Sequence, residues 1–372
     1  MFKTALKFIL FDKAKSFGAL MGIIISTFLV AQQTGIFLFL TDSMSRLVDK
    51  SDAALWVVDS STKNVNALIP IDIRVLRQIE SIPGIAKAYP LLIAGGSARF
   101  ADGTAAGIQL IGIQLPEAKG GPITLEEGTF NELVPAGAVA FDVYDRPAFG
   151  GAGMGTNFEI GGKRVYFAAA TRGFRGFGAQ YLLTSVERAR YLGNFSTSKI
   201  SAGLVYLDSA QNPIQVRDQI NSTINGVRAW LPSEFSKQTK LTVLSTTGIA
   251  ISIGTLLIFA VISGFFIIGL TLYSAAIDRI RDYGTLKAIG ATNGYITRLI
   301  LLQATIFTII GFLFGMLLAE GFRAGIANAG TIFFYTWPLR LAFLGITMLI
   351  SFGGAVFAIK RINGVEPASV FR

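Results

Sequence analysis

Four stretches of the chain contain no Asp, Glu, Lys or Arg. They are Phe17–Phe39, Ile249–Tyr273, Leu299–Leu318 and Leu341–Ile359. A helix rises ~1.5 Å per residue, so each stretch is long enough to cross a hydrocarbon core of ~30 Å. A buried helix of a soluble protein explains one such stretch but not four. The pattern predicts transmembrane helices at 17–40, 247–273, 299–320 and 339–360, and the first is too long for the ~7–15 residue core of a cleaved signal peptide.

Residues 41–240 separate the first two of these helices and alternate between strand-like and helix-like patterns. Strands are predicted at Ala54–Asp59 and Ala202–Asp208. Helices are predicted at Asp72–Ser81, with Asp72 as N-cap, and at Asn212–Asn225, with Asn212 as N-cap and Pro213 in the first turn. GIAKAYP and GVRAWLP follow the two helices at equivalent places. We therefore expect two β-α-β half-units, 50–100 and 200–235, in one membrane-proximal subdomain, with chance similarity as the alternative.

Residues 101–199 predict an inserted β-rich subdomain, with strands beginning at Ala138 and Val165. Glycine-rich stretches interrupt it at Ala148–Gly155 and Arg172–Gly178. GGAGMG lacks the strand–loop–helix frame and the GK[ST] ending of a phosphate-binding loop. These stretches are either mobile loops or a contact surface for a partner protein. The side chains that favour the contact surface are Phe149, Met154, Phe174, Arg175 and Phe177. The predicted fold is an α-helical membrane protein with four transmembrane helices and an extracytoplasmic α/β domain of β-α-β half-units with a β-rich insertion.

The net charge of +10 is concentrated beside the apolar stretches. Residues 41–240 carry 20 basic and 18 acidic residues, whereas the remainder carries 13 basic and 5 acidic residues. The basic residues of the remainder cluster before helix one, between helices two and three, and after helix four. Cytoplasmic loops carry such an excess, so both termini are expected inside, with 41–240 and the loop 321–338 outside. This distribution disfavours nucleic acid as a partner, and lipids surround the helices.

Several chemistries lack their usual residues in this sequence. The chain has no Cys and no His, which removes disulfides, Cys/His metal sites and histidine-assisted nucleophiles. It also has no G-x-x-x-x-G-K-[ST] motif, so it cannot itself bind ATP through a Walker A loop. We expect no catalytic residue, metal or cofactor, although a membrane-anchored hydrolase that uses only carboxylates remains an alternative.

Small residues mark possible helix contacts in the membrane. Gly18 and Gly22 form a G-x-x-x-G pattern in the first helix, and Gly311 and Gly315 form another in the third. Glycine at this spacing allows two helices to approach closely. Glycine is also common in membrane helices generally, so each pattern alone is weak.

The cytoplasmic segments have distinct patterns. Residues 1–16 predict an amphipathic interfacial helix, or an extension of the first membrane helix. Residues 274–298 are polar, amphipathic and broken by glycines, and are longer than a tight loop needs, which indicates a docked helix. Residues 361–372 form a basic tail. The alternative for 274–298 is a solvated basic loop that only sets topology.

The sequence RDYGTLKAIGATNGYI resembles the signature R-E-x-G-x-[LK]-[KR]-A-[LI]-G-A of FtsX/MacB/LolC-type ABC permeases. The matching positions are Arg281, Gly284, Leu286, Lys287, Ala288, Ile289, Gly290 and Ala291. Asp282 stands where glutamate is usual and Tyr283 where an aliphatic residue is usual. The tail AIKRINGVEPASVFR and the order of one helix, a large external domain and three helices are also similar to this family.

The resemblance implies a mechanotransmission permease in the bacterial inner membrane. A separate cytosolic ATPase would bind ATP and Mg, and would contact this chain through Arg281, Asp282, Gly284, Leu286, Lys287, Ile289 and Gly290. Two permease copies would pair through helices one and two, with Gly18 and Gly22 as candidate contacts. The domain would act with a periplasmic adaptor and an outer-membrane channel to export a lipid-like or other substrate, as in the DevC-type subunits. A regulator of a cell-wall hydrolase and a LolC/LolE-like lipoprotein-releasing permease are the alternatives.

The charge distribution generates a direct test of topology. Because the chain has no cysteine, single cysteines can be labelled without background. We expect Ser60→Cys to react with a membrane-impermeant thiol reagent added from outside, and Thr292→Cys to stay unlabelled until the membrane is opened. The reverse pattern would overturn the orientation.

Overall fold

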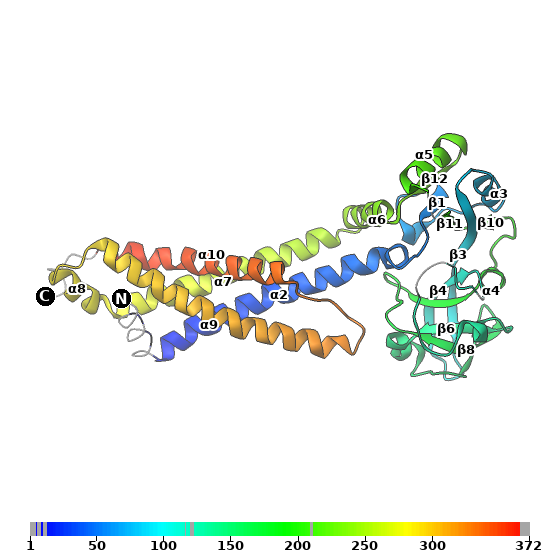
Figure 1. The fold of residues 1–372 in the computed structure, drawn as a ribbon. Helices are drawn as coiled ribbons and strands as arrows, with labels where there is room; N and C mark the ends of the chain where they lie inside the picture. Colours follow the sequence, from blue (N-terminus) through cyan, green and yellow to red (C-terminus); the bar gives the residue numbers. More distant parts are fainter. Residues whose placement is uncertain are drawn as a thin grey trace. The chain divides into compact units, whose positions relative to one another are not determined.

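The computed structural model describes residues 5, 9, 13–115, 117–119, 123–208 and 211–364. It separates into two compact units (Figure 1). The first contains residues 1–39 and 249–372, and the second contains Leu40–Gly248. Most of the predicted interfacial helix 1–16 and the end of the predicted tail 361–372 lie outside the described residues.

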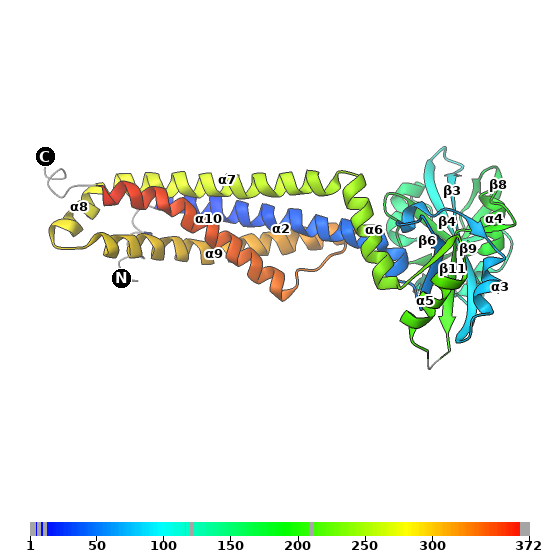
Figure 2. The same cartoon turned by 90° about the horizontal axis from the view of Figure 1, so that it is seen from above.

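The first unit is a bundle of long apolar helices, as the sequence predicts. Four helices of the described chain are long and apolar enough to cross a membrane. The four long helices are α2 (Lys13–Asp49), α7 (Ile249–Asp278), α9 (Asn293–Ala327) and α10 (Trp337–Asn363). The short helix α8 (Ile280–Ala288) lies between α7 and α9. Figure 2 shows the long helices running alongside one another, with α8 joining α7 to α9 at one end. Each long helix continues beyond its uncharged stretch.

Glycines allow these helices to approach closely. In α9, a Cβ atom at Gly311 would lie 2.4 Å from Ile23 Cγ2 of α2, and one at Gly315 would lie 3.0 Å from the Ile24 carbonyl oxygen. The G-x-x-x-G pattern in α9 therefore packs against α2 of the same chain. Hydroxyl groups add polar contacts, since Thr27 Oγ1 and Thr347 Oγ1 lie 3.1 Å apart between α2 and α10.

The second unit is built on one large sheet. The strands of this unit are β1 (Leu55–Asp59), β2 (Ile71–Asp72), β3 (Ile85–Arg99), β4 (Ala105–Ile113), β5 (Leu125–Glu127), β6 (Ala138–Asp142), β7 (Asn157–Ile160), β8 (Lys163–Thr171), β9 (Gln180–Ser185), β10 (Lys199–Ile200), β11 (Ala202–Leu207) and β12 (Val227–Trp230). Among the described residues, β2 and β10 pair with each other, and the other ten strands form the large sheet. The helices are α3 (Val75–Glu80), α4 (Val186–Leu192), α5 (Pro213–Thr223) and α6 (Pro232–Thr246), with 3-10 turns η1 (Val65–Ala67), η2 (Phe130–Leu133) and η3 (Val143–Phe149).

The two predicted β-α-β half-units are present and interleave. One is β1-α3-β3 and the other is β11-α5-β12, and their strands lie in the order β12-β1-β11-β3, all antiparallel to their neighbours. Asn212 caps α5 by accepting a hydrogen bond from the Ile214 amide, and Pro213 opens the helix, as predicted. After each helix the chain turns at a glycine with positive φ, Gly84 at 91° and Gly226 at 81°, a backbone conformation that favours glycine.

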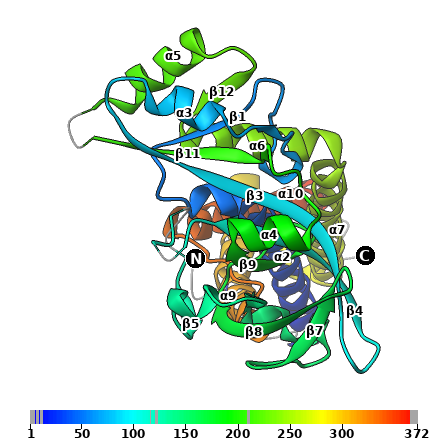
Figure 3. The same ribbon diagram turned by 90° about the vertical axis from the view of Figure 1, so that its right-hand side faces the viewer.

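The inserted region is not a separate sheet, because β3 belongs to both parts. Residues Ile85–Leu91 of β3 pair with β11, and Leu92–Arg99 pair with β4. Figure 3 shows β3 crossing the domain from the side of α3 and α5 to the side of β7 and β8. The predicted β-rich insertion therefore continues the sheet of the membrane-proximal part through β3, and this sheet contains ten strands among the described residues.

One predicted cap is wrong. Asp72 lies in β2 and pairs with Lys199 of β10, and α3 begins only at Val75, preceded by Arg74 without a side-chain cap. The Asp72 carboxylate instead accepts hydrogen bonds from the backbone amide and the guanidinium of Arg74. The Asp72 carboxylate is therefore hydrogen-bonded within the local turn and does not cap the helix.

The glycine contacts in α9 generate a prediction about packing. We expect Gly315→Ala to destabilise the bundle by about 1–3 kcal/mol, because the added methyl group must displace the α2 backbone. The measurement is thermal or denaturant unfolding of the chain in detergent. Gly321→Ala, also in α9 but with open space around its Cβ position, is the matched control and should be neutral or stabilising. Equal effects of the two substitutions would contradict this packing.

Candidate functional site

The connection between α7 and α9 forms an anchored, partly exposed helix. Tyr283 of α8 is 2% exposed and packs in the bundle core. Lys287 Nζ donates hydrogen bonds to the carbonyl oxygens of Ile362 and Asn363, each at 3.0 Å. A lysine at this position satisfies carbonyl groups that the end of α10 leaves without helical partners. The helix α8 is thereby tied to α10, far away in the sequence.

The residues predicted to contact an ATPase divide into two groups. Gly284 is buried, and Leu286 and Lys287 are half-buried and face the chain's own bundle. The exposed group contains Arg281, Asp282, Ile289 and Gly290. Ile289 is 77% exposed, and Gly290 ends the turn with a φ of 98°. Ile289, rather than Leu286, is therefore the exposed one of the two predicted apolar contact residues.

The glycines predicted for pairing of two copies lie in different environments. Gly22 is buried, and a Cβ atom there would lie 2.5 Å from Ile267 Cγ2 of α7. Gly22 is therefore used for packing within the chain and is not available as a contact between copies. Gly18 is exposed.

The predicted contact surface of the external domain is wrong for two of its five residues. Phe149 is 1% exposed and packs with the rings of Phe100, Phe141 and Phe167. Phe174 is 6% exposed, with its ring centroid 5.4 Å from that of Tyr181. Glycine neighbours made these rings resemble loop residues, but the glycines turn the chain so that the rings point into the core. Met154 is exposed, and Arg175 and Phe177 are half-buried.

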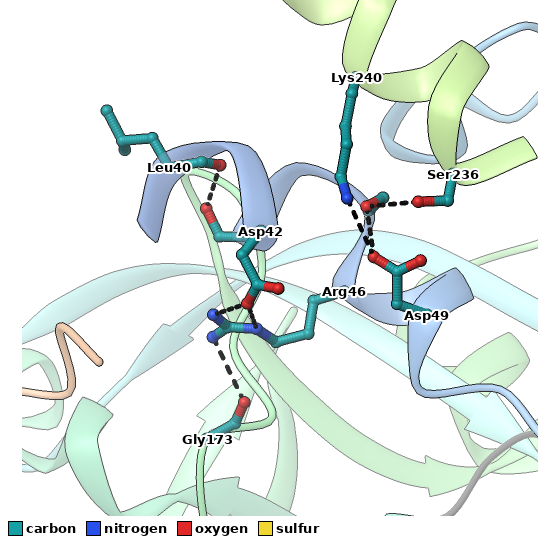
Figure 4. Close-up of polar contacts among 9 residues, drawn as sticks. Leu40, Asp42, Arg46, Asp49, Gly173, Ser236 and Lys240 are labelled. Atoms are coloured by element: carbon teal, nitrogen blue, oxygen red, sulfur yellow. Dashed lines mark hydrogen bonds and ion pairs between the residues drawn. The ribbon is translucent and has the colours of Figure 1, made fainter. Parts of the chain in front are cut away.

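A polar seam joins the last turns of α2, Leu40–Asp49, to α6. The Ser236 hydroxyl donates to Ser45 Oγ at 3.0 Å, and the Ser45 hydroxyl donates to the Asp49 carboxylate at 2.6 Å. Lys240 Nζ lies 3.5 Å from the same carboxylate (Figure 4). Ser45 and Ser236 are buried, so these hydrogen bonds are shielded from water. We call this pair of helix segments the stem and these contacts the stem seam.

The stem also contacts the inserted part of the domain. Arg46 is 8% exposed and forms an ion pair with Asp42 at 2.7 Å. Its Nη1 donates to the carbonyl oxygen of Gly173 at 3.4 Å, as Figure 4 shows. The next amide, that of Phe174, donates to the buried Asp142 carboxylate at 2.7 Å. A line of polar contacts thus runs from α2 to the end of β6.

A second carboxylate lies beside Asp142. Asp145 is 2% exposed and accepts a hydrogen bond from Arg175 Nε at 2.7 Å. Burial raises its pKa to about 6, against the opposing charge of Arg175. Burial also raises the pKa of Asp142, although several hydrogen bonds act in the other direction. Removing a carboxylate from water disfavours its charged form, which explains both shifts.

The sequence analysis did not identify the stem residues or the two buried carboxylates. One available signal was that Leu40–Asp49 contains neither Gly nor Pro, so nothing stops the first membrane helix at its apolar end. Asp42 and Arg46 also have the i, i+4 spacing of a helical ion pair. No local pattern distinguishes Asp142 and Asp145 from surface residues. Among the described residues, no group of three or more carboxylates could hold a metal ion.

One part of the chain matches a known protein family. Residues 254–367, from within α7 to beyond α10, match the FtsX-like permease C-terminal family. No curated protein matches the chain. The periplasmic region of MacB from Actinobacillus actinomycetemcomitans is 12% identical, with a TM-score of 0.39, over 52% of this chain and 92% of that one. The extracellular domain of the noncanonic ABC-type transporter YknZ from Gram-positive bacteria is 14% identical, with a TM-score of 0.35, over 48% of this chain and 98% of that one.

The family match covers the helices α8, α9 and α10 and most of α7, and so includes the anchored turn that carries Ile289. These elements are the part of the chain in which the signature residues lie. Residues 254–367 are thus similar to the C-terminal part of FtsX-like permeases.

Proposed function

We propose that this permease couples ATP hydrolysis by a separate cytosolic ATPase to movement of its external domain. The exposed part of α8 is the contact surface for the ATPase. Arg281 and Asp282 supply charge there, and Ile289 supplies an apolar side chain that is 77% exposed.

The anchoring of α8 is the observation that carries the proposal. A turn that only set membrane topology would need basic charge, but not tertiary contacts. Here Tyr283 is buried in the bundle, and Lys287 holds the last carbonyl groups of α10. A force applied to α8 therefore acts on three membrane helices, two by chain connection and one through Lys287.

Helix continuity supplies the route to the domain. The helix α2 extends from Lys13 to Asp49 and ends in the stem. Only Thr247 and Gly248 separate α6 from α7. The stem seam joins these two segments, so the ends of α2 and α6 would move together. We infer that the domain receives one coordinated displacement rather than two independent ones.

Export from the periplasm through an adaptor and an outer-membrane channel is the form of transport that we favour. The four uncharged stretches offer no acidic or basic group that could line a hydrophilic conduit. The substrate would then be moved outside the inner membrane by the domain and its partners. A dimer of the permease, with one ATPase on each copy, is the assembly that this mechanism requires.

The proposal predicts the effect of a charge at the exposed apolar position of α8. We expect Ile289→Glu to reduce co-purification of the partner ATPase at least tenfold, because the carboxylate would be buried against the ATPase without a partner. Phe334→Glu is the matched control, since Phe334 is 69% exposed but lies in the loop predicted to be outside. Both variants should insert normally into the membrane. Normal recruitment by the Ile289 variant would sink the assignment of this surface.

The short distance across the stem seam predicts that two engineered cysteines would form a disulfide between α2 and α6. The hydroxyl oxygens of Ser45 and Ser236 are 3.0 Å apart, so Ser45→Cys with Ser236→Cys should cross-link on mild oxidation. Loss of reaction with a thiol-specific mass tag measures the bond. Ser43→Cys with Ser236→Cys is the control and should not cross-link, because residues two apart point to different sides of a helix.

The same disulfide tests whether the stem helices move together. We expect the oxidised Ser45/Ser236 variant to keep the ATP hydrolysis rate of the permease–ATPase complex, since the seam does not open in the proposed cycle. Inhibition that is reversed by a reductant would show that the two helices must separate.

A further inference from the structure

The segment Arg172–Gly178, between β8 and β9, is attached to its surroundings at four successive residues. Arg172 forms an ion pair with Glu126 and a hydrogen bond with Tyr144. The Gly173 carbonyl accepts from Arg46 of α2, the Phe174 amide donates to Asp142, and Arg175 pairs with Asp145. We call this segment the clasp, because it connects the stem helix α2 with the end of β6 and η3.

The interior side of the clasp is tightly packed. The Phe174 ring packs on Tyr181, and a Cβ atom at Gly176 would lie 2.2 Å from the same tyrosine ring. Any outward movement of the clasp therefore breaks ring contacts and uncovers the groups beneath it. Those groups include Asp142 and Asp145, which are fully buried and 2% exposed, respectively.

The two carboxylates differ in how well they are satisfied. Asp142 accepts hydrogen bonds from the amides of Tyr144 and Phe174 and from the Thr171 hydroxyl. Among the described residues, Asp145 has one hydrogen-bond partner, Arg175, and its buried Oδ2 atom has none. A buried carboxylate oxygen without a partner is costly when the group is charged. The charged form of Asp145 is therefore less stable in the closed clasp than it would be in water.

Two charged groups act directly on Asp145, and two more lie on the elements next to it. Arg175 approaches from the clasp, and Asp142 from the end of β6. Arg146 follows in η3, with its guanidinium over the Phe141 ring. Arg46 of α2 contacts the clasp one residue before Phe174. The attraction of Arg175 and the repulsion of Asp142 act in opposite directions on Asp145, and burial exceeds both.

We propose that the clasp is a proton-sensitive contact between the inserted part of the domain and α2, and that its hold weakens when Asp145 loses its proton. Opening the clasp exposes Asp145 to water, where a carboxyl ionises with an ordinary pKa of about 3.9. In the closed clasp the pKa of Asp145 is about 6. The closed state therefore binds the proton more tightly, and closure is favoured at low pH and lost as the pH rises through about 6.

The pH sensitivity of the clasp would regulate the proposed coupling, and this regulatory role rests on the proposed function. The outer face of the domain is exposed to a compartment whose pH follows the surroundings. A closed clasp would make the inserted part of the domain follow α2, and a loosened clasp would let α2 move without it. The pH outside the membrane would then set how much of the stem movement reaches the insertion.

Hydrogen exchange of the full-length chain in detergent measures clasp opening without an ATPase. The Phe174 amide is protected by its bond to Asp142, so peptides covering 172–178 report on opening. After correction for the intrinsic pH dependence of exchange, we expect opening to be about tenfold more frequent at pH 7.5 than at pH 5, as a shift of the Asp145 pKa from about 4 to about 6 requires. An unchanged opening frequency, or more opening at pH 5, would overturn the proposal.

Two variants and a control complete the test. Asp145→Asn keeps the side chain neutral and should remove most of the pH dependence, with slow exchange at both values. Arg46→Met should increase opening at both values while keeping the tenfold ratio, because it removes the hold of α2 but not the titrating group. Asp218→Asn, at an exposed surface ion pair, should behave like the parent chain.

The outcomes separate the clasp from the proposed function. Wild-type pH dependence in Asp145→Asn, or parental exchange in Arg46→Met, would contradict the clasp. If Asp145→Asn does not fold, the pH dependence of the parent chain and the exchange of the Arg46 variant still test the clasp proposal. ATPase recruitment through Ile289 is measured independently, so either proposal can fail while the other stands.

Discussion

The helical hydrogen bonding of α2 does not stop where its apolar run ends, and the rest of the structure depends on this continuity. In the hydrocarbon core a helix is required, because every backbone donor and acceptor must be satisfied within the segment. Beyond Phe39 that requirement ends, and a helix in water needs tertiary contacts to remain ordered. Leu47 and Val48 supply apolar ones by packing in the domain core, and Ser45 and Arg46 supply polar ones.

Burying Arg46, Asp142 and Asp145 costs free energy that apolar residues would not have required. Hydrogen bonds compensate the Arg46 guanidinium and the Asp142 carboxylate well. Arg46 pairs with Asp42 and donates to the Gly173 carbonyl, and Asp142 accepts from three donors. Asp145 is not well compensated, since one oxygen of its carboxylate lacks a hydrogen-bond partner in the part of the chain that the structure describes. A group that is poorly satisfied in a well-packed region makes the stability of its neighbourhood depend on protonation. A loop without such a buried, poorly satisfied carboxylate would not respond to pH in this way.

Much of this architecture follows from local pattern, and the parts that do not follow depend on tertiary contacts. Twenty uncharged residues in a row leave few alternatives to a membrane helix, and Asn-Pro before an amphipathic run is a specific helix start, so α7 and α5 were predictable. Asp72 failed as a cap because Arg74 offered its carboxylate a nearer set of donors. Phe149 and Phe174 failed as surface residues because composition near glycines does not reveal which way a ring points. Gly22 packs on Ile267, a partner more than two hundred residues away, which no spacing rule identifies.

The short helix α8 combines two requirements that are usually in conflict. A surface that receives a force must be exposed to its partner, yet it must also be fixed to what it moves. In the proposed coupling, these tasks fall to different sides of α8: Tyr283 and Lys287 fix it to the bundle, while Arg281, Asp282 and the Ile289 that follows remain accessible. The helical repeat of 3.6 residues permits this division within nine residues. The left-handed turn at Gly290 then allows α9 to begin at once, so the exposed side lies directly beside the start of a membrane helix.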